Sequence, residues 1–183
     1  CIAVLCLCLI ACLGSSAIIY AGESKIKISV AHQFPTKHIQ AKAVQKFADL
    51  VTERTNGKAQ FQIFPAGQLY KGKEIIQAVT SGEVNMGLSY IGFWSGIFKE
   101  AEIMDIPFLI DSYDVADKTL SGEVGRFFAS KMEEAGAIKV MWLGQGIYLA
   151  FTSKTKLFKK PQDFKGLIFR AASKGTFALA EAL

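Results

Sequence analysis

Cysteine is absent beyond residue 12, because the four cysteines of this chain all fall within residues 1–12. A disulfide framework, a thiolate nucleophile and a cysteine metal site are therefore excluded from the rest of the chain. Histidine is scarce as well. His32 and His38 are the only two, and their spacing does not suit a pair of metal ligands on one helix. We expect neither a metal nor a cofactor.

The common catalytic motifs are also missing. The segment Gly92–Gly96 reads GFWSG and is not the Gly-x-Ser-x-Gly turn of a nucleophile elbow. Gly144 and Gly146 lack the third glycine of a dinucleotide fingerprint, and no phosphate-binding Gly-Lys-Ser/Thr occurs. The paired carboxylates Glu133 and Glu134 are expected on the exposed side of a helix. We predict that the protein is not an enzyme, with a hydrolase as the alternative.

No charged residue precedes Glu23, and residues 1–13 form an apolar run that is followed by Gly-Ser-Ser. This pattern is typical of a secretory signal, so we expect residues 1–21 to be a signal peptide without its basic start. Lipidation at Cys12 and a retained membrane anchor are the alternatives. Because the chain starts at Cys1 and stops within an apolar helix pattern, we expect it to be cut at both ends.

The net charge of +5 is carried by scattered lysines, which are densest between Lys154 and Lys160. A scattered excess of this kind indicates a solvated surface, and it suits an anionic ligand. It does not resemble the basic stripe with interleaved aromatic residues that binds nucleic acid. We therefore expect no nucleic-acid partner.

Strand and helix patterns alternate along most of the chain. Alternating apolar residues predict strands, and apolar residues at helical spacing predict amphipathic helices. The expected strands are 25–30, 59–64, 84–90, 138–143 and 147–153, and the expected helices are 37–55, 72–81, 112–136 and 173–183. The order favours an α/β fold with a mostly parallel sheet flanked by helices, whose ligands bind at the carboxyl ends of the strands.

Arg170 is the only charge in the apolar run Leu167–Ala172. A buried charge without a partner is costly, so this guanidinium needs an anion. Ser173 can cap the following helix, and a guanidinium beside a helix N-terminus suits a carboxylate. From the spacing alone, an edge-strand arginine that reaches water is the alternative.

Other candidate ligand-binding residues lie where strands end or helices begin. His32 and Gln33 end the first strand, although a loop histidine bonded to the backbone is equally possible for His32. Glu74 opens the second helix, where a solvated glutamate also complements the helix dipole. Ser89, Tyr90, Phe93 and Trp94 follow the third strand; of these we select Ser89 and Trp94, while noting that aromatic residues are more often core.

Four segments, taken in order, resemble the substrate-binding subunit of TRAP transporters, the DctP-type solute-binding family. They are FPAGQL at 64–69, GEVNMG at 82–87, DIPFL at 105–109 and PQDFKGLIFR at 161–170. The resemblance covers essentially all of residues 25–183. It implies a two-lobed, periplasmic-binding-protein-like fold in which residues 22–145 form the first lobe and residues 146–183 begin an incomplete second lobe.

The resemblance also implies a function. Such a receptor closes on a small organic acid in the periplasm and delivers it to the small and large integral membrane subunits of a TRAP permease. The family's carboxylate-binding arginine falls on Arg170. Many members carry a second arginine on the preceding strand, whereas residues 146–152 contain none and offer Tyr148. We therefore expect the far end of the ligand to meet apolar or hydroxyl groups. A sensory module of the same fold and a receptor for an ATP-driven importer are the alternatives.

Overall fold

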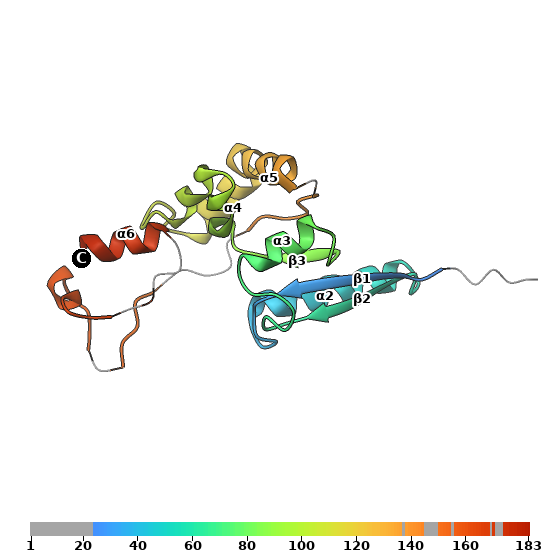
Figure 1. The fold of residues 1–183 in the computed structure, drawn as a ribbon, viewed down its shortest axis with the longest axis horizontal. Coiled ribbons are helices and arrows are strands. Elements are labelled where there is room, and N and C mark those ends of the chain that lie inside the picture. Colours follow the sequence, from blue (N-terminus) through green and yellow to red (C-terminus); the bar gives the residue numbers. More distant parts are fainter. Residues whose placement is uncertain (1–23, 137, 145–149, 155, 169, 171–173) are drawn as a thin grey trace, which may run out of the picture.

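The computed structural model describes residues 24–136, 138–144, 150–154, 156–168, 170 and 174–183. The expected signal peptide, the expected lobe boundary at 145–146, Tyr148 and Ser173 lie outside the described residues. Figure 1 shows the order of the elements. They are β1 (Ile26–His32), α2 (Ile39–Arg54), β2 (Ala59–Phe64), α3 (Glu74–Thr80), β3 (Met86–Leu88), the 3₁₀ helices η1 (Ile91–Gly96) and η2 (Lys99–Asp105), α4 (Tyr113–Ser121), α5 (Glu123–Gly136), the 3₁₀ helix η3 (Pro161–Phe164) and α6 (Lys174–Ala182).

The described strands form one parallel sheet with the order β2-β1-β3. β1 lies in the centre, where Ile26 pairs with Ala59 of β2 and His32 pairs with Leu88 of β3. The helical crossovers α2 and α3 connect these strands, as parallel pairing requires. The carboxyl ends of the strands therefore lie along one edge, which is the edge where open α/β sheets bind ligands.

The third strand is shorter than the sequence predicts. Its pattern extends over 84–90, but only Met86–Leu88 pairs with β1. β1 ends at His32, so residues that follow Leu88 have no strand beside them. A strand needs a neighbour for its backbone groups, and residues that lack one leave the sheet.

Two further expectations are corrected. The described residues of the segments 138–143 and 147–153 contain no strand, because none of the described strands lies alongside them. The helix expected over 112–136 is divided into α4 and α5 at Gly122. The corner is tight: a Cβ at Gly125 would clash with the carbonyl oxygen of Leu120. Only glycine fits there.

The larger core lies between the 3₁₀ helices and the α4–α5 pair. Its buried residues are Ile76, Trp94, Phe98, Ala101, Leu120, Phe128 and Met132. Ser112 caps α4, since its Oγ accepts a hydrogen bond of 3.3 Å from the Val115 backbone N–H. Val115, Val124 and Phe127 are apolar residues of these two helices that lie outside the core, each at least 40% exposed.

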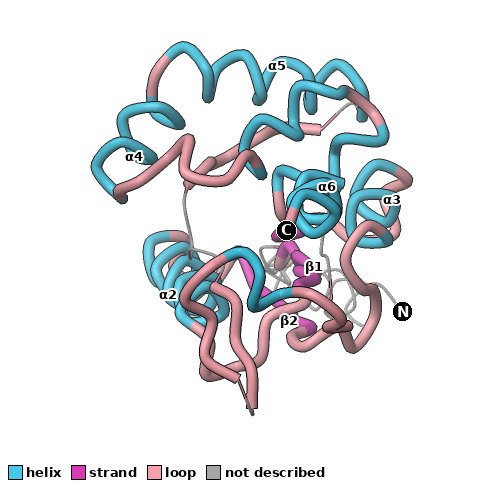
Figure 2. The backbone as a smooth tube through the Cα atoms, turned by 90° about the vertical axis from the view of Figure 1, so that its left-hand side faces the viewer, coloured by secondary structure: helices cyan, strands magenta, loops and turns pink. Residues whose placement is uncertain are grey.

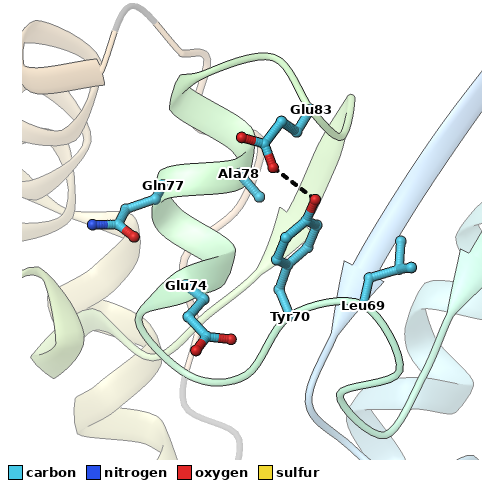
Figure 3. A pocket seen from close by; sticks show the side chains of 6 residues that line it. All are labelled: Leu69, Tyr70, Glu74, Gln77, Ala78 and Glu83. Atoms are coloured by element: carbon cyan, nitrogen blue, oxygen red, sulfur yellow. Dashed lines mark hydrogen bonds between the residues drawn. The ribbon is translucent and has the colours of Figure 1, made fainter.

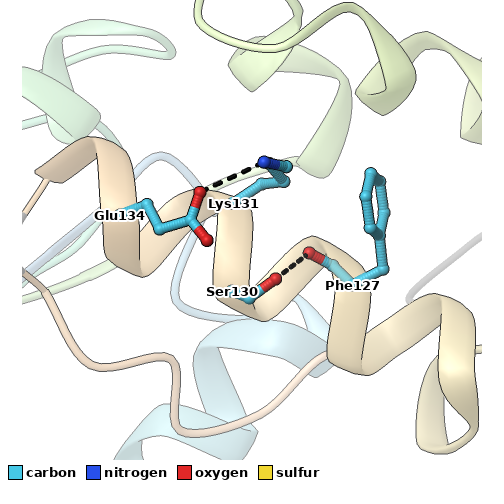
Figure 4. Close-up of polar contacts among 4 residues, drawn as sticks. All are labelled: Phe127, Ser130, Lys131 and Glu134. Carbon is cyan, nitrogen blue, oxygen red and sulfur yellow. Dashed lines mark hydrogen bonds and ion pairs between the residues drawn. The ribbon is translucent and has the colours of Figure 1, made fainter.

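Helix α5 turns a polar face outward, which Figure 4 shows. Lys131 pairs with Glu134 across one turn at 3.1 Å, and the Lys131 Nζ lies 5.9 Å from the ring centre of Phe127. Ser130 Oγ donates a hydrogen bond of 2.8 Å to the Phe127 carbonyl. Exposed contacts of this kind contribute little to stability, and this face carries no site candidate.

Helix α6 lies against η2. A Cβ at Gly175 would stand 3.0 Å from the Cβ of Asp105, so the close approach depends on glycine. In Figures 1 and 2, α6 lies beyond the ends toward which β1 and β2 point. Arg170 lies shortly before α6 in the chain.

Candidate functional site

The carboxyl ends of β1 and β3 place polar side chains side by side. His32 is paired with Leu88, so Gln33 and Ser89 are the next residues along two neighbouring strands. We call the set formed by His32, Gln33, Ser89, Tyr90 and Arg170 the carboxyl-edge cluster.

His32 is the most buried member of the cluster, with 1% of its surface exposed. Its backbone carbonyl accepts a hydrogen bond of 3.0 Å from Gly67 N–H, which joins the Pro-Ala-Gly turn to β1. Burial lowers the pKa of the imidazole from its ordinary value of 6.5. The side chain is therefore neutral at pH 7, and its Nδ1 has no hydrogen-bond partner in the described part of the chain.

The second unpartnered atom belongs to Ser89, the residue that follows β3. Its Oγ is buried and makes no hydrogen bond to any residue that the structure describes. A buried polar group left without a partner costs about 1–3 kcal/mol. Two such atoms, one in His32 and one in Ser89, therefore lie where the paired strands end.

Tyr90 presents a hydroxyl at the same edge and is 40% exposed. Its ring packs edge-on against Phe34 and Phe93, with centroid distances of 5.4 and 5.5 Å. Desolvation raises the pKa of Tyr90, while hydrogen bonding with the Gln33 side chain and the positive charge of Arg170 act in the opposite direction. Gln33 and Tyr90 are thus neighbours, and Tyr90 also feels the charge of Arg170.

Gly72 lies beside Gln33 and has φ of +50°, which a residue with a side chain adopts only with strain. A Cβ there would meet the Phe93 ring at 3.5 Å and Gln33 Oε1 at 3.8 Å, which are ordinary contact distances. Gln33 and Phe93 therefore flank the same point of the chain.

Arg170 is exposed in this structure. Its positive charge is one of the influences that lower the pKa of Tyr90. Trp94, in contrast, is 6% exposed and packs in the core with Phe98 and Phe128, which is the alternative that its sequence context left open. Tyr148 lies outside the described residues.

Glu74 belongs to a separate groove, shown in Figure 3. The groove has a volume of about 340 Å³, and its lining residues are Leu69, Tyr70, Glu74, Gln77, Ala78 and Glu83. Glu74 Oε2 accepts a hydrogen bond of 2.9 Å from Lys71 N–H, which ties the first residue of α3 to the turn before it. Tyr70 donates its hydroxyl to Glu83 Oε2 at 2.7 Å.

Sequence reasoning did not select Tyr90. The available signal was its position directly after Ser89 at a strand end, but periodicity does not separate a tyrosine at the edge from a tryptophan in the core. Among the described residues, no cluster of three His, Cys, Asp or Glu side chains could hold a metal ion. The described helices are also too short or too polar to cross a membrane.

The chain is similar to several characterised proteins. It is 33% identical over 138 residues to a 2,3-diketo-L-gulonate-binding periplasmic protein of Escherichia coli, covering 75% of this chain and 41% of that protein. It is 31% identical over 150 residues to a C4-dicarboxylate-binding periplasmic protein of Vibrio cholerae, covering 81% and 44%. The chain thus spans less than half the length of these relatives.

Solved structures show the same similarity. A TRAP periplasmic solute-binding protein from Sulfurospirillum deleyianum with bound succinate matches with a TM-score of 0.56 and 29% identity, over 61% of this chain and 36% of that one. A sugar-acid-binding protein from Advenella mimigardefordensis in complex with galactonate matches with a TM-score of 0.60 and 25% identity, over 62% and 36%. These matches confirm the predicted fold class.

The model of one protein family matches residues 30–183, which is most of the chain. The four motifs that suggested this relationship all lie within the matched range. The chain therefore belongs to family 7 of the bacterial extracellular solute-binding proteins, the DctP family.

Proposed function

We propose that this protein is an extracytoplasmic receptor that binds a small organic acid through Arg170 at the carboxyl-edge cluster. The observation that carries the proposal is the influence of the Arg170 charge on Tyr90. Arg170 acts on Tyr90, beside two buried polar atoms that have no partner in the described residues. A guanidinium binds a carboxylate with two parallel hydrogen bonds, and the neutral groups can bind the rest of the ligand.

We further propose that the ligand is buried by closure of two lobes around it. Arg170 is exposed here, and an exposed ion pair contributes little free energy because water screens it. Closure removes that water, so binding and closure favour each other. In this proposal His32, Gln33, Ser89 and Tyr90 come from the first lobe, and Arg170 comes from the start of the second.

The receptor would pass its ligand to the small and large integral membrane subunits of a TRAP permease. The family is described as extracellular, and the E. coli and V. cholerae relatives are described as periplasmic. Export by a signal peptide at residues 1–21 is part of the same proposal. The enzyme alternative has no support, since the family and the structural neighbours are solute-binding proteins.

Isothermal titration of the full chain against a panel of organic acids tests the proposal. We expect at least one carboxylate to bind, and Arg170→Ala to weaken its binding by about 2–5 kcal/mol, the range for truncating one member of a buried charge pair. Arg170→Lys should recover part of the loss, because it retains the charge without the two-pronged geometry.

Arg126→Ala is the matched control, since Arg126 is an exposed arginine on α5. Its affinity should equal that of the unmodified protein. The assignment would be contradicted if the Arg170→Ala variant bound the acid as tightly as the unmodified protein. It would also be contradicted if the folded protein bound no acid.

A further inference from the structure

We propose that Asp105 is a positioning residue, which joins η1, the element that follows Tyr90, to α6, the element that follows Arg170. This inference rests on the proposed function, in which Arg170 binds the acid. It adds a residue outside the carboxyl-edge cluster that acts on binding through Arg170.

The carboxylate of Asp105 occupies the space that Gly92 leaves open in η1. A Cβ at Gly92 would collide with Asp105 Oδ2 and would lie 3.1 Å from Cγ and 3.2 Å from Oδ1. The whole carboxylate therefore lies against the backbone of η1, and a side chain at Gly92 would push it away. Gly92 is two residues after Tyr90, so this contact is made beside a member of the cluster.

Asp105 also lies against the first turn of α6. Gly175 is the second residue of that helix, and a Cβ there would lie 3.0 Å from Asp105 Cβ and 3.2 Å from the Asp105 carbonyl oxygen. The first turn of α6 has no acidic residue of its own. Because a negative charge near a helix N-terminus is stabilising, Asp105 supplies from another segment the charge that α6 lacks.

The position of α6 limits where Arg170 can lie. Arg170 precedes Lys174, the first residue of α6, by four residues. A chain spans at most about 3.6 Å per residue, so the Arg170 Cα lies within roughly 14 Å of the start of the helix. The charge of Arg170 in turn acts on Tyr90. Asp105 is thus connected on one side to Tyr90 and on the other to Arg170, and displacement of α6 would move Arg170 relative to Tyr90.

Titration of the full chain with succinate and with galactonate, the acids bound by two structural relatives, measures the effect on binding. We expect Asp105→Asn to weaken the binding of these acids by roughly two- to fivefold, the factor that one charge at a helix end contributes. Asp114→Asn removes a first-turn carboxylate from α4 and is the matched control. Its affinity should equal that of the unmodified protein.

The ionisation of Tyr90 provides a readout that needs no ligand. Arg170 lowers the pKa of Tyr90, so Arg170→Ala should raise it, and Asp105→Asn should raise it by moving Arg170 away. Loss of the Asp105 charge alone would lower this pKa, so the direction of the change separates positioning from a direct electrostatic effect. In the double variant the pKa should rise no further than in Arg170→Ala. Nuclear magnetic resonance of protein labelled at tyrosine Cζ follows each tyrosine, and Tyr90→Phe identifies the signal.

Gly175→Ala is a second variant that keeps the Asp105 charge. Alanine favours a helix more than glycine does, so α6 should still form, but its Cβ would press the helix away from Asp105. The pKa of Tyr90 should rise in this variant too.

The inference would be overturned if the pKa of Tyr90 stayed the same or fell in both Asp105→Asn and Gly175→Ala. Unchanged acid affinity in a folded Asp105→Asn protein would overturn it as well. Both results leave the receptor function standing. Failure of every acid in the broad panel would instead remove the receptor function, while the titration of Tyr90 would still decide whether Asp105 positions Arg170.

Discussion

Asn85 and Ser29 are joined by three hydrogen bonds that fasten the start of β3 to the centre of the sheet. Asn85 Oδ1 accepts from the backbone N–H and from the hydroxyl of Ser29, each at 2.9 Å, and Ser29 Oγ accepts from the Asn85 backbone N–H at 3.0 Å. The side-chain oxygen of Asn85 takes the place of a strand carbonyl. It thereby sets where β3 begins and, three residues later, where the site edge lies.

Replacing Asn85 tests whether its side-chain oxygen contributes to stability as a hydrogen-bond acceptor. In Asn85→Ala two hydrogen bonds are lost, and we expect the free energy of unfolding to fall by about 1–2 kcal/mol. Asn85→Asp keeps an acceptor oxygen at the same position, so its free energy of unfolding should fall by much less. Urea unfolding of both variants measures the difference. Equal losses in the two variants would contradict an acceptor role.

Gly87 permits close packing of α3 on β3. A Cβ at this position would lie 2.7 Å from the Cγ2 atoms of both Ile75 and Val79. Gly87→Ala should therefore lower the free energy of unfolding by about 1–3 kcal/mol, as over-packing in a core does. At Gly96 a Cβ would meet nothing within 4 Å. Gly96→Ala is the control, and thermal unfolding should separate the two variants.

Burial of His32 should make the protein less stable in mild acid. Desolvation lowers the pKa of the folded state below the ordinary value of 6.5, so below about that pH the unfolded state binds more protons than the folded state. The His32 contribution is complete above pH 6.5 and is lost as the pH falls toward the folded-state pKa. Denaturant unfolding across this range should show a slope that His32→Gln reduces. An unchanged slope would show that another group titrates.

Tyr70 should ionise at a higher pH than an ordinary tyrosine. Its hydroxyl donates to Glu83 Oε2 at 2.7 Å, and this hydrogen bond is the main cause that raises the pKa of Tyr70. Ultraviolet titration of the tyrosinate band should show a late-titrating component, because the pKa values of Tyr70 and Tyr90 are both raised, and Tyr70→Phe should remove the Tyr70 share of it. In Glu83→Gln the transition should move toward the usual pKa of about 10. A late transition that persists in both variants would belong to another tyrosine.

Local sequence determined the first half of the fold. Alternation over 25–30 and 59–64 and the helical stripe over 37–55 correspond closely to β1, β2 and α2, because each pattern is written within one segment. The Pro-Ala-Gly turn after β2 is likewise a local pattern, written in consecutive residues. Gly67 has φ of +70°, a conformation that glycine adopts without strain.

The motifs also indicated the family, and some of their residues have clear structural roles. Asn85 of the GEVNMG segment fastens β3, and Gly87 makes room for α3. Their partners, Ser29 and the Ile75–Val79 face of α3, lie elsewhere in the chain, but the residues themselves stand in short segments that can be recognised without coordinates.

Tertiary structure decided which side chains reach the site. Tyr90 and Trp94 are both aromatic residues after the third strand, yet one is 40% exposed at the edge and the other 6% exposed in the core. The difference depends on where η1 packs against α5, a contact that spans tens of residues along the chain. Strand length was decided in the same way, because β3 can extend only as far as β1 offers backbone groups to pair with it.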